Sequence, residues 1–246
     1  MPIRNDTDSG PLSRFLGWVG SHERGFLLSV AALLVGLSAF ALLADEVMEG
    51  GTVGIDRKIL MAMRNPHNLA DPVGPPIVEE AARDITALGG NTILAFLTVV
   101  IGVYMMLDGK RRLALFLWGS VCTGTLMGSL LKYGFARPRP ALVPHSVYVS
   151  YSSFPSGHAM LSAVTFLTLG ALLARSDDRR RMKAFFMLVA AGLTLAVGVT
   201  RVYLGVHWPT DVLAGWAAGA IWALLCWTVA RWLQRRRKIE TDSGGQ

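Results

Sequence analysis

The chain has 246 residues, of which 52% are hydrophobic and only 17% are charged, and its formal net charge is +7. An average soluble domain has about 25% charged residues, so this composition excludes a disordered or coiled-coil chain and argues against a soluble globule. The apolar residues fall into runs of about 20, the length that spans the hydrocarbon core of a bilayer. We therefore expect an integral membrane protein.

Six apolar stretches are candidate membrane spans. They cover residues 25–44, 87–107, 113–131, 158–174, 184–200 and 212–230. A lone strand cannot satisfy its backbone in lipid, and the alternation typical of a barrel is absent, so all six are predicted to be helices. The predicted fold class is all-α, a bundle of six transmembrane helices. The first stretch is too long for a signal-peptide core, which favours an uncleaved anchor.

The connection between the first and second spans, residues 45–86, is the longest. Ile55, Ile59 and Met63 recur in it at four-residue spacing, and a second periodic stretch begins at Pro75-Pro76. These patterns predict short amphipathic helices at the membrane interface. They could pack against the bundle, form a lid or admit lipid, and the sequence does not separate these roles.

Lysine and arginine predict the orientation of the bundle. One side of the membrane would hold 16 of the 24, and the other side 8, so the positive-inside rule places both termini in the cytoplasm. Residues 45–86, 132–157 and 201–211 then face outward. The basic residues lie between apolar runs, so topology accounts for them better than a nucleic-acid partner does.

This topology divides the chain into three parts. Residues 1–24 form a cytoplasmic segment, residues 25–233 form the six-span domain with its core at 90–230, and residues 234–246 form a basic, polar tail. Oligomeric state is left open.

The first of three outward polar patches follows the third span. It runs from Lys132 to Pro140 and contains two Arg-Pro pairs, at Arg137 and Arg139. By itself it could be a group of snorkelling side chains at a membrane boundary.

The second patch opens the fourth span with Phe154-Pro-Ser-Gly-His. Ser156 is a predicted N-cap, Gly157 allows a ligand close to the backbone, and the free N–H groups of the helix start attract anions. His158 adds a proton donor. By itself the patch could be only a helix cap with an interfacial histidine.

The third patch joins the fifth and sixth spans and contains Arg201, His207 and Asp211. His207 and Asp211 are four residues apart, so the carboxylate could accept one imidazole N–H and leave the other nitrogen free to act as a nucleophile or base. By itself this patch could also be a cap pair beside an interfacial arginine.

All three patches are predicted to lie on the same membrane face. Guanidinium groups, a lysine and helix-end amides match the oxygens of a phosphate. The sequence has neither a carboxylate cluster for magnesium nor a Gly-x-x-x-x-Gly-Lys loop for ATP, so we expect no metal and no other cofactor.

These motifs resemble those of the type 2 phosphatidic acid phosphatase superfamily, which also contains vanadium haloperoxidases. The family pattern is Lys-x6-Arg-Pro, then Pro-Ser-Gly-His, then Ser-Arg-x5-His-x3-Asp. Lys132 and Arg139-Pro140 match the first part and set its register against Arg137, while Thr200 stands where the family usually has serine. The resemblance covers about residues 90–230.

The resemblance implies a role for each matching residue. His207 would attack phosphorus and form a phosphohistidine, Asp211 would orient it, and His158 would protonate the leaving oxygen and then activate water. The phosphate oxygens would be held by Lys132, Arg139, Ser156, Gly157 and Arg201. Arg137 is interpreted as a charge on the rim of the site.

We therefore expect a metal-independent lipid phosphatase of a bacterial plasma membrane, with its site facing the exterior or periplasm. The family implies undecaprenyl diphosphate, phosphatidylglycerophosphate or phosphatidic acid as substrates, the first being favoured for a role in cell-wall biogenesis. A phosphatase of lipid A or another head group is an alternative within the superfamily. An anion channel or transporter is an alternative from another class, although charges at span ends and the absence of a repeat argue against it.

Overall fold

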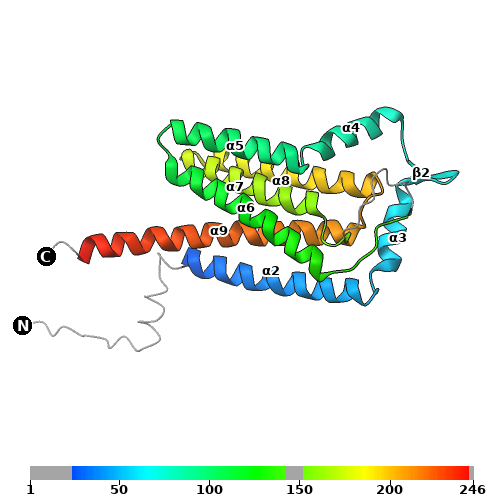
Figure 1. Cartoon of the computed structure of the whole chain (residues 1–246), viewed down its shortest axis with the longest axis horizontal. Helices are drawn as coiled ribbons and strands as arrows, with labels where there is room; N and C mark the ends of the chain where they lie inside the picture. The colour runs from blue at the N-terminus through cyan, green and yellow to red at the C-terminus, as the bar shows by residue number, and fades with distance from the viewer. Residues whose placement is uncertain (1–23, 142–151, 244–246) are drawn as a thin grey trace, which may run out of the picture.

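A computed structural model of the protein describes residues 24–141 and 152–243, and the side chains of 25–141 and 152–233. Residues 1–23 of the predicted cytoplasmic segment and residues 244–246 of the predicted tail lie outside the described residues. The described chain is an elongated bundle of long helices with a group of short elements at one end (Figure 1).

Eight helices and one hairpin make up the described residues. In chain order they are α2 (Arg24–Met48), α3 (Val53–Ala62), β1 (Arg64–Asn65), β2 (Asn68–Pro72), α4 (Pro76–Ala87), α5 (Asn91–Leu107), α6 (Arg111–Gly134), α7 (Gly157–Ser176), α8 (Arg180–Tyr203) and α9 (Pro209–Ser243). Five of these helices, α2, α6, α7, α8 and α9, are each long and apolar enough to cross a membrane. The predicted all-α membrane bundle is confirmed.

The second predicted span departs from the expected single helix. The apolar run over 87–107 corresponds to α5 and the short break before it. A sixth crossing is reached only if α5 and the preceding helix α4, whose axes differ by 49°, form one bent span. The break lies at Gly89-Gly90. A Cβ on Gly89 would lie 2.3 Å from Val197 Cγ1 on α8, so the chain passes too close to α8 for a side chain at this position.

The two amphipathic helices predicted within 45–86 are present as α3 and α4. On α3, however, Ile55 and Ile59 are exposed, while Asp56 and Leu60 are buried. The antiparallel hairpin β1–β2 between the two helices was not predicted. The apolar stripe of α3 therefore faces away from the protein, and a carboxylate lies on its buried side.

Contacts with α8 hold this long connection against the bundle. The guanidinium of Arg64 donates to the backbone oxygen of Tyr203, and the Tyr203 hydroxyl donates to the oxygen of Val73 at 2.8 Å. Arg201 donates to the Thr86 hydroxyl at 3.3 Å. These bonds favour a packing role for residues 45–86 over that of a loose lid.

The core of the bundle is α7, which packs against α5, α6, α8 and α9. The start of α7 lies close against Gly215 and Gly219 of α9. A Cβ on Gly215 would lie 2.6 Å from the oxygen of Ser156, and one on Gly219 would lie 2.4 Å from the oxygen of Met160. Small residues four apart let two membrane helices approach this closely.

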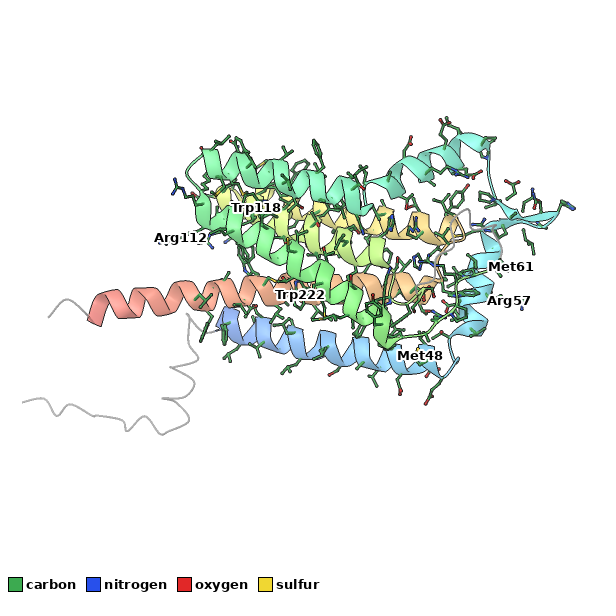
Figure 2. The ribbon with its side chains drawn as sticks, viewed as in Figure 1. Met48, Arg57, Met61, Arg112, Trp118 and Trp222 are labelled. Carbon is green, nitrogen blue, oxygen red and sulfur yellow. The ribbon has the colours of Figure 1, made fainter. Side chains whose placement is uncertain are left out.

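Tryptophan indoles also tie the helices together along the bundle. Trp118 on α6 donates to the oxygen of Thr98 on α5 at 3.0 Å, and Trp222 on α9 donates to the oxygen of Ser120 on α6 at 3.2 Å. Trp222 lies near the middle of the bundle, and Trp118 lies nearer the end with Arg112 (Figure 2). They fix the helices whose ends form the site described next.

Candidate active site

The residues predicted to bind and cleave phosphate lie at one end of the bundle, the end that also carries α3. Lys132 is in the last turn of α6, Ser156 precedes α7, Arg201 is in the last turn of α8 and Asp211 is in the first turn of α9. Figure 2 shows Arg57 and Met61 of α3 at this end and Arg112 at the opposite end. The fold therefore brings the three sequence patches together.

His207 and Asp211 form a buried pair. His207 lies in the turn between α8 and α9, and its Nδ1 is 3.4 Å from Oδ2 of Asp211. The same Oδ2 accepts the backbone N–H of Trp208 at 3.0 Å, which holds the carboxylate in place. Because Nδ1 faces the carboxylate, Nε2 is the ring nitrogen that could react with a substrate.

Arg139 lies directly at that nitrogen. One of its terminal nitrogens is 3.2 Å from Nε2 of His207, and the same nitrogen donates to the backbone oxygen of Val206 at 3.1 Å. Its Nε is buried and has no hydrogen-bond partner among the described residues. A cation that can hold a phosphate oxygen is thus adjacent to the atom that could attack phosphorus.

The start of α7 contributes a second anion-binding surface. Ser156 is the N-cap residue of α7, as predicted, but its hydroxyl makes no capping hydrogen bond. That hydroxyl is instead buried and without a hydrogen-bond partner among the described residues. A Cβ on Gly157 would lie 3.0 Å from Nζ of Lys132, so the ammonium lies against the first turn of the helix.

His158 connects the two halves of the site. It interacts electrostatically with Lys132, Arg139, Arg201 and His207, which come from α6, the 135–140 segment, α8 and the α8–α9 turn. Arg201 also has a buried Nε without a hydrogen-bond partner among the described residues. Three cations, two imidazoles and unpaired donors therefore converge on one small volume, an arrangement suited to a tetrahedral dianion.

Burial sets the protonation state of His207, which lies outside the spanning helices. The pKa of His207 is lowered from 6.5 to about 4, chiefly by burial; the hydrogen bond that the ring donates to Asp211 raises it, and the charge of Arg139 lowers it. The imidazole is therefore neutral at physiological pH, the form that a nucleophile needs.

Arg137 is not on the rim, which corrects the sequence interpretation. It is buried, and its two terminal nitrogens donate at 2.6 Å to Oδ1 of Asp211 and to Oδ2 of Asp56. Sequence reasoning missed both Arg137 and Asp56. The available signal was weak, because Asp56 is four residues before the apolar Leu60 but is directly followed by Arg57 and Lys58.

Two further observations complete the description of the site. The Thr200 hydroxyl donates to the oxygen of Val197 within α8, at 2.7 Å, and so does not face the phosphate site. Among the described residues, no group of three or more His, Cys, Asp or Glu side chains could hold a metal ion.

A comparison of the sequence with models of protein families identifies the family of the chain. Residues 113–235, half of the chain, match the model of the PAP2 superfamily. The chain belongs to the PAP2 superfamily. The match begins at the start of α6 and contains every predicted site residue, so the superfamily's shared region and the convergent site coincide.

Two PAP2 relatives and one solved structure are similar to this chain. Phosphatidylglycerophosphatase B of Bacillus subtilis is 34% identical over 147 residues, which cover 59% of this chain and 72% of that protein. A lipid A 1-phosphatase of Rhizobium etli is 26% identical over 63% of this chain and 74% of its own. The crystal structure of a transmembrane PAP2 type phosphatidylglycerolphosphate phosphatase from B. subtilis superposes with a TM-score of 0.70 at 28% identity, covering 81% of this chain and 96% of that one. The prediction of a membrane lipid phosphatase is confirmed.

Proposed function

We propose that this PAP2 lipid phosphatase transfers the phosphoryl group of its substrate first to His207 and then to water. The observation that carries the proposal is the position of the His207 ring. Its Nδ1 faces the buried carboxylate of Asp211, and its Nε2 faces the guanidinium of Arg139. The proposed nucleophile His207 and its orienting group Asp211 are thus held at the α8–α9 turn, next to the proposed phosphate ligand Arg139.

In the first step Nε2 of His207 forms a bond to phosphorus while the bond from phosphorus to the ester or anhydride oxygen breaks. His158 donates a proton to that leaving oxygen. Asp211 supports the positive charge that the phosphorylated ring acquires, because its Oδ2 faces Nδ1. The product is a phosphohistidine and a released alcohol or lipid phosphate.

In the second step water attacks the phosphohistidine. His158, now neutral, takes a proton from the water as its oxygen bonds to phosphorus and the N–P bond breaks. Lys132, Arg139 and Arg201 neutralise the phosphoryl oxygens in both steps, and the hydroxyl of Ser156 and the N–H of Gly157 donate to them. The cations and amides supply the charge stabilisation that a metal ion supplies in other phosphatases.

The substrate is a lipid whose phosphate or diphosphate reaches the end of the bundle while its chains stay in the bilayer. The similarity to a phosphatidylglycerophosphatase supports glycerolipid phosphates, and that to a lipid A 1-phosphatase keeps a saccharolipid head group as the second candidate. Undecaprenyl diphosphate, favoured from the sequence, is the third.

We also propose that the protein lies in a bacterial plasma membrane with its site facing outward. The distribution of lysine and arginine supports this orientation, because the site is at the end with fewer of them.

The test is phosphate release by the purified full-length protein, in detergent with EDTA, from phosphatidylglycerophosphate, phosphatidic acid, undecaprenyl diphosphate and lipid A. We expect release from at least one lipid, and we expect His207→Ala to abolish it. Release that depends on added Mg²⁺, or an active His207→Ala variant, would contradict the proposal.

A further inference from the structure

A buried ionic cluster joins α3 to the catalytic end of α9. Arg137 binds Asp211 through one terminal nitrogen and Asp56 through the other, both at 2.6 Å, and all three side chains are almost completely buried. Thr210 completes the cluster. Its hydroxyl donates to Oδ2 of Asp56 at 2.6 Å and accepts from Arg137 at 2.8 Å, and its backbone N–H donates to Oδ1 of Asp56 at 2.9 Å.

We propose that Asp56, acting through Arg137, is a positioning residue for the Asp211–His207 pair. This inference rests on the proposed function. Asp211 presents one oxygen to Arg137 and the other to His207 and the N–H of Trp208, so the guanidinium fixes which oxygen faces the imidazole. Asp56 in turn fixes the guanidinium.

The charge count of the cluster gives Asp56 a second effect. Two carboxylates share one guanidinium, so the buried group carries one excess negative charge. That excess can stabilise the positive imidazole ring that phosphorylation creates. Without Asp56, Arg137 would pair with Asp211 alone, and the excess negative charge would be lost. A buried ion pair is strongly affected when one partner is removed.

A double-mutant cycle distinguishes positioning from simple structural support. Asp56→Asn, Asp211→Asn and the double variant are compared by kcat and KM for phosphatidic acid in EDTA. Because Asp56 acts through Asp211, we expect Asp56→Asn to lower kcat about 10- to 100-fold with KM within twofold, and to have almost no further effect in Asp211→Asn. A purely structural residue would lower activity by the same factor in both backgrounds.

The matched control is Asp84→Asn, the same substitution at an exposed position on the neighbouring interfacial helix α4, which should leave kcat unchanged. If Asp56→Asn does not give a monodisperse protein, Thr210→Val is used in the same cycle, since it removes the bridging hydroxyl and keeps both charges. Independent losses, or an Asp56 variant as active as Asp84→Asn, would overturn the inference. Wild-type protein that is inactive on every lipid would instead overturn the proposed function.

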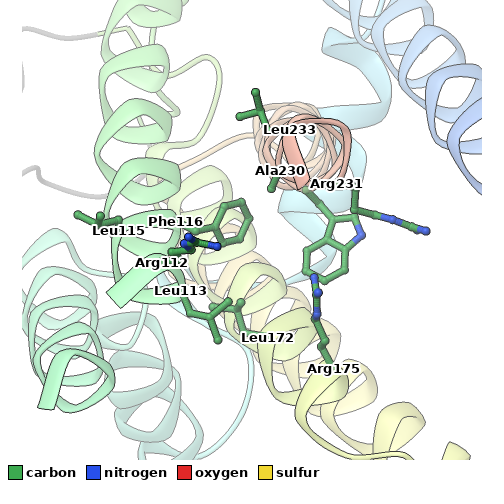
Figure 3. A pocket seen from close by; sticks show the side chains of 10 residues that line it. Arg112, Leu113, Leu115, Phe116, Leu172, Arg175, Ala230, Arg231 and Leu233 are labelled. Atoms are coloured by element: carbon green, nitrogen blue, oxygen red, sulfur yellow. The ribbon is translucent and has the colours of Figure 1, made fainter. Parts of the chain in front are cut away.

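A second, independent observation concerns the opposite end of the bundle. A pocket of about 410 Å³ lies between α6, α7 and α9. Figure 3 shows Arg112 and Arg175 extending toward it from different helices, with Phe116 and Leu172 between them. Its lining consists of Arg112, Leu113, Leu115, Phe116, Leu172, Arg175, Trp227, Ala230, Arg231 and Leu233.

The geometry points to a binding site for an anionic phospholipid of the surrounding bilayer. Seven of the ten lining residues are apolar and suit an acyl chain. Arg112 and Arg175 come from two different helices and suit a phosphodiester head, while the guanidinium of Arg231 extends away from the pocket toward Gly25 of α2 (Figure 3). The guanidinium of Arg175 lies 5.9 Å from the centre of the Trp227 ring, which orients it beside the pocket. Basic pockets between membrane helices bind lipid head groups by this combination of charge and apolar contact.

The test compares lipid retention and thermal stability of the purified full-length protein with dioleoyl phosphatidylglycerol or dioleoyl phosphatidylcholine. We expect native mass spectrometry to show retained phosphatidylglycerol and an apparent Tm several degrees higher with it. Arg112→Gln combined with Arg175→Gln should abolish both, with phosphate release unchanged. Arg111→Gln combined with Arg180→Gln removes the same charge nearby and should keep both. Equal retention of the two lipids, or equal loss in both double variants, would overturn the assignment.

Discussion

The chemistry of the site depends on a few side chains whose hydrogen bonds are incomplete in the protein alone. Ser156 Oγ and the Nε atoms of Arg139 and Arg201 are buried without partners among the described residues. A buried donor without a partner is costly, so such groups are usually retained for a ligand. In this site the ligand that suits them is a phosphoryl group.

The unpaired Ser156 hydroxyl gives the first prediction. Ser156→Ala removes a donor that is used only when phosphate is bound, so we expect kcat/KM to fall about 100-fold while the apparent Tm stays the same or rises. Ser162→Ala is the matched control, because that buried hydroxyl donates to the oxygen of Ala159 inside α7. A lower Tm with unchanged kcat/KM would show that Ser156 has only a structural role.

Protonation of His207 gives the second prediction. Burial and Arg139 lower its pKa to about 4, so the ring is neutral above that pH and becomes charged only below it. NMR of histidine-labelled protein, with the signal assigned from His207→Ala, should give a titration midpoint near pH 4. In Arg139→Gln the midpoint should rise, because a positive charge beside the ring is removed while Asp211 and Arg201 remain. A midpoint near 6.5 in the wild type would contradict the buried environment.

The sequence predicted which residues lie near one another better than it predicted their hydrogen bonds. Spacing within three motifs was enough to predict that His158, His207, Asp211 and the proposed phosphate ligands lie at the same end of the bundle, where the structure places them. The interpretation of Arg137 failed because its partner Asp56 is 81 residues away and on another element. A charge beside a membrane boundary usually reaches water, and only the fold shows that this one points inward.

At the scale of the elements, the long helices were predicted from hydropathy and the short ones less well. The hairpin β1–β2 has strands of two and five residues, too short for a pattern of alternation to emerge. The bend between α4 and α5 lies at the start of the predicted apolar run, where Gly89 passes close to Val197 of α8, and such a tertiary contact leaves no mark in the hydropathy pattern.

The contact between α7 and α9 gives the third prediction. Gly219→Leu places a side chain where a Cβ alone would lie 2.4 Å from a backbone oxygen, so we expect α9 to move away from α7. The overpacking cost is about 1–3 kcal/mol, and the same displacement shifts Asp211 from Ser156. Both the apparent Tm and kcat should fall.

Its control is Gly119→Leu, a helical glycine of α6 with no atom near its Cβ position. That variant should keep the wild-type Tm and activity. Equal Tm values for the two leucine variants would show that the α7–α9 approach is not close in the folded protein.

On the scale of the whole molecule, the length of the bundle separates the proposed active site from the basic pocket. The phosphate-binding groups gather at the end with α3, and the basic pocket between α6, α7 and α9 lies at the other end (Figure 2). Charged groups at the ends of the helices avoid the cost of placing them in the hydrocarbon region. The sequence predicted this division from the grouping of lysine and arginine.

The membrane orientation gives the fourth prediction. Single cysteines at Asn68, in the hairpin, and at Asp108, after α5, would be placed in a chain whose Cys122 and Cys226 are changed to serine. In intact bacterial cells a membrane-impermeant thiol reagent should label the cysteine at position 68 and leave that at position 108 unlabelled until the cells are opened. The reverse pattern would invert the orientation, and labelling of both in intact cells would contradict six crossings.

The most direct test of the central claim is to trap the covalent intermediate. The full-length protein is mixed with lipid substrate in EDTA, quenched in alkali and mapped by mass spectrometry, with His158→Ala included to slow hydrolysis by water. We predict a phosphoryl group on the peptide that contains His207, accumulating further in His158→Ala and absent from His207→Ala. Turnover of the lipid with no phosphorylated His207, or with the phosphoryl group on another residue, would contradict the account.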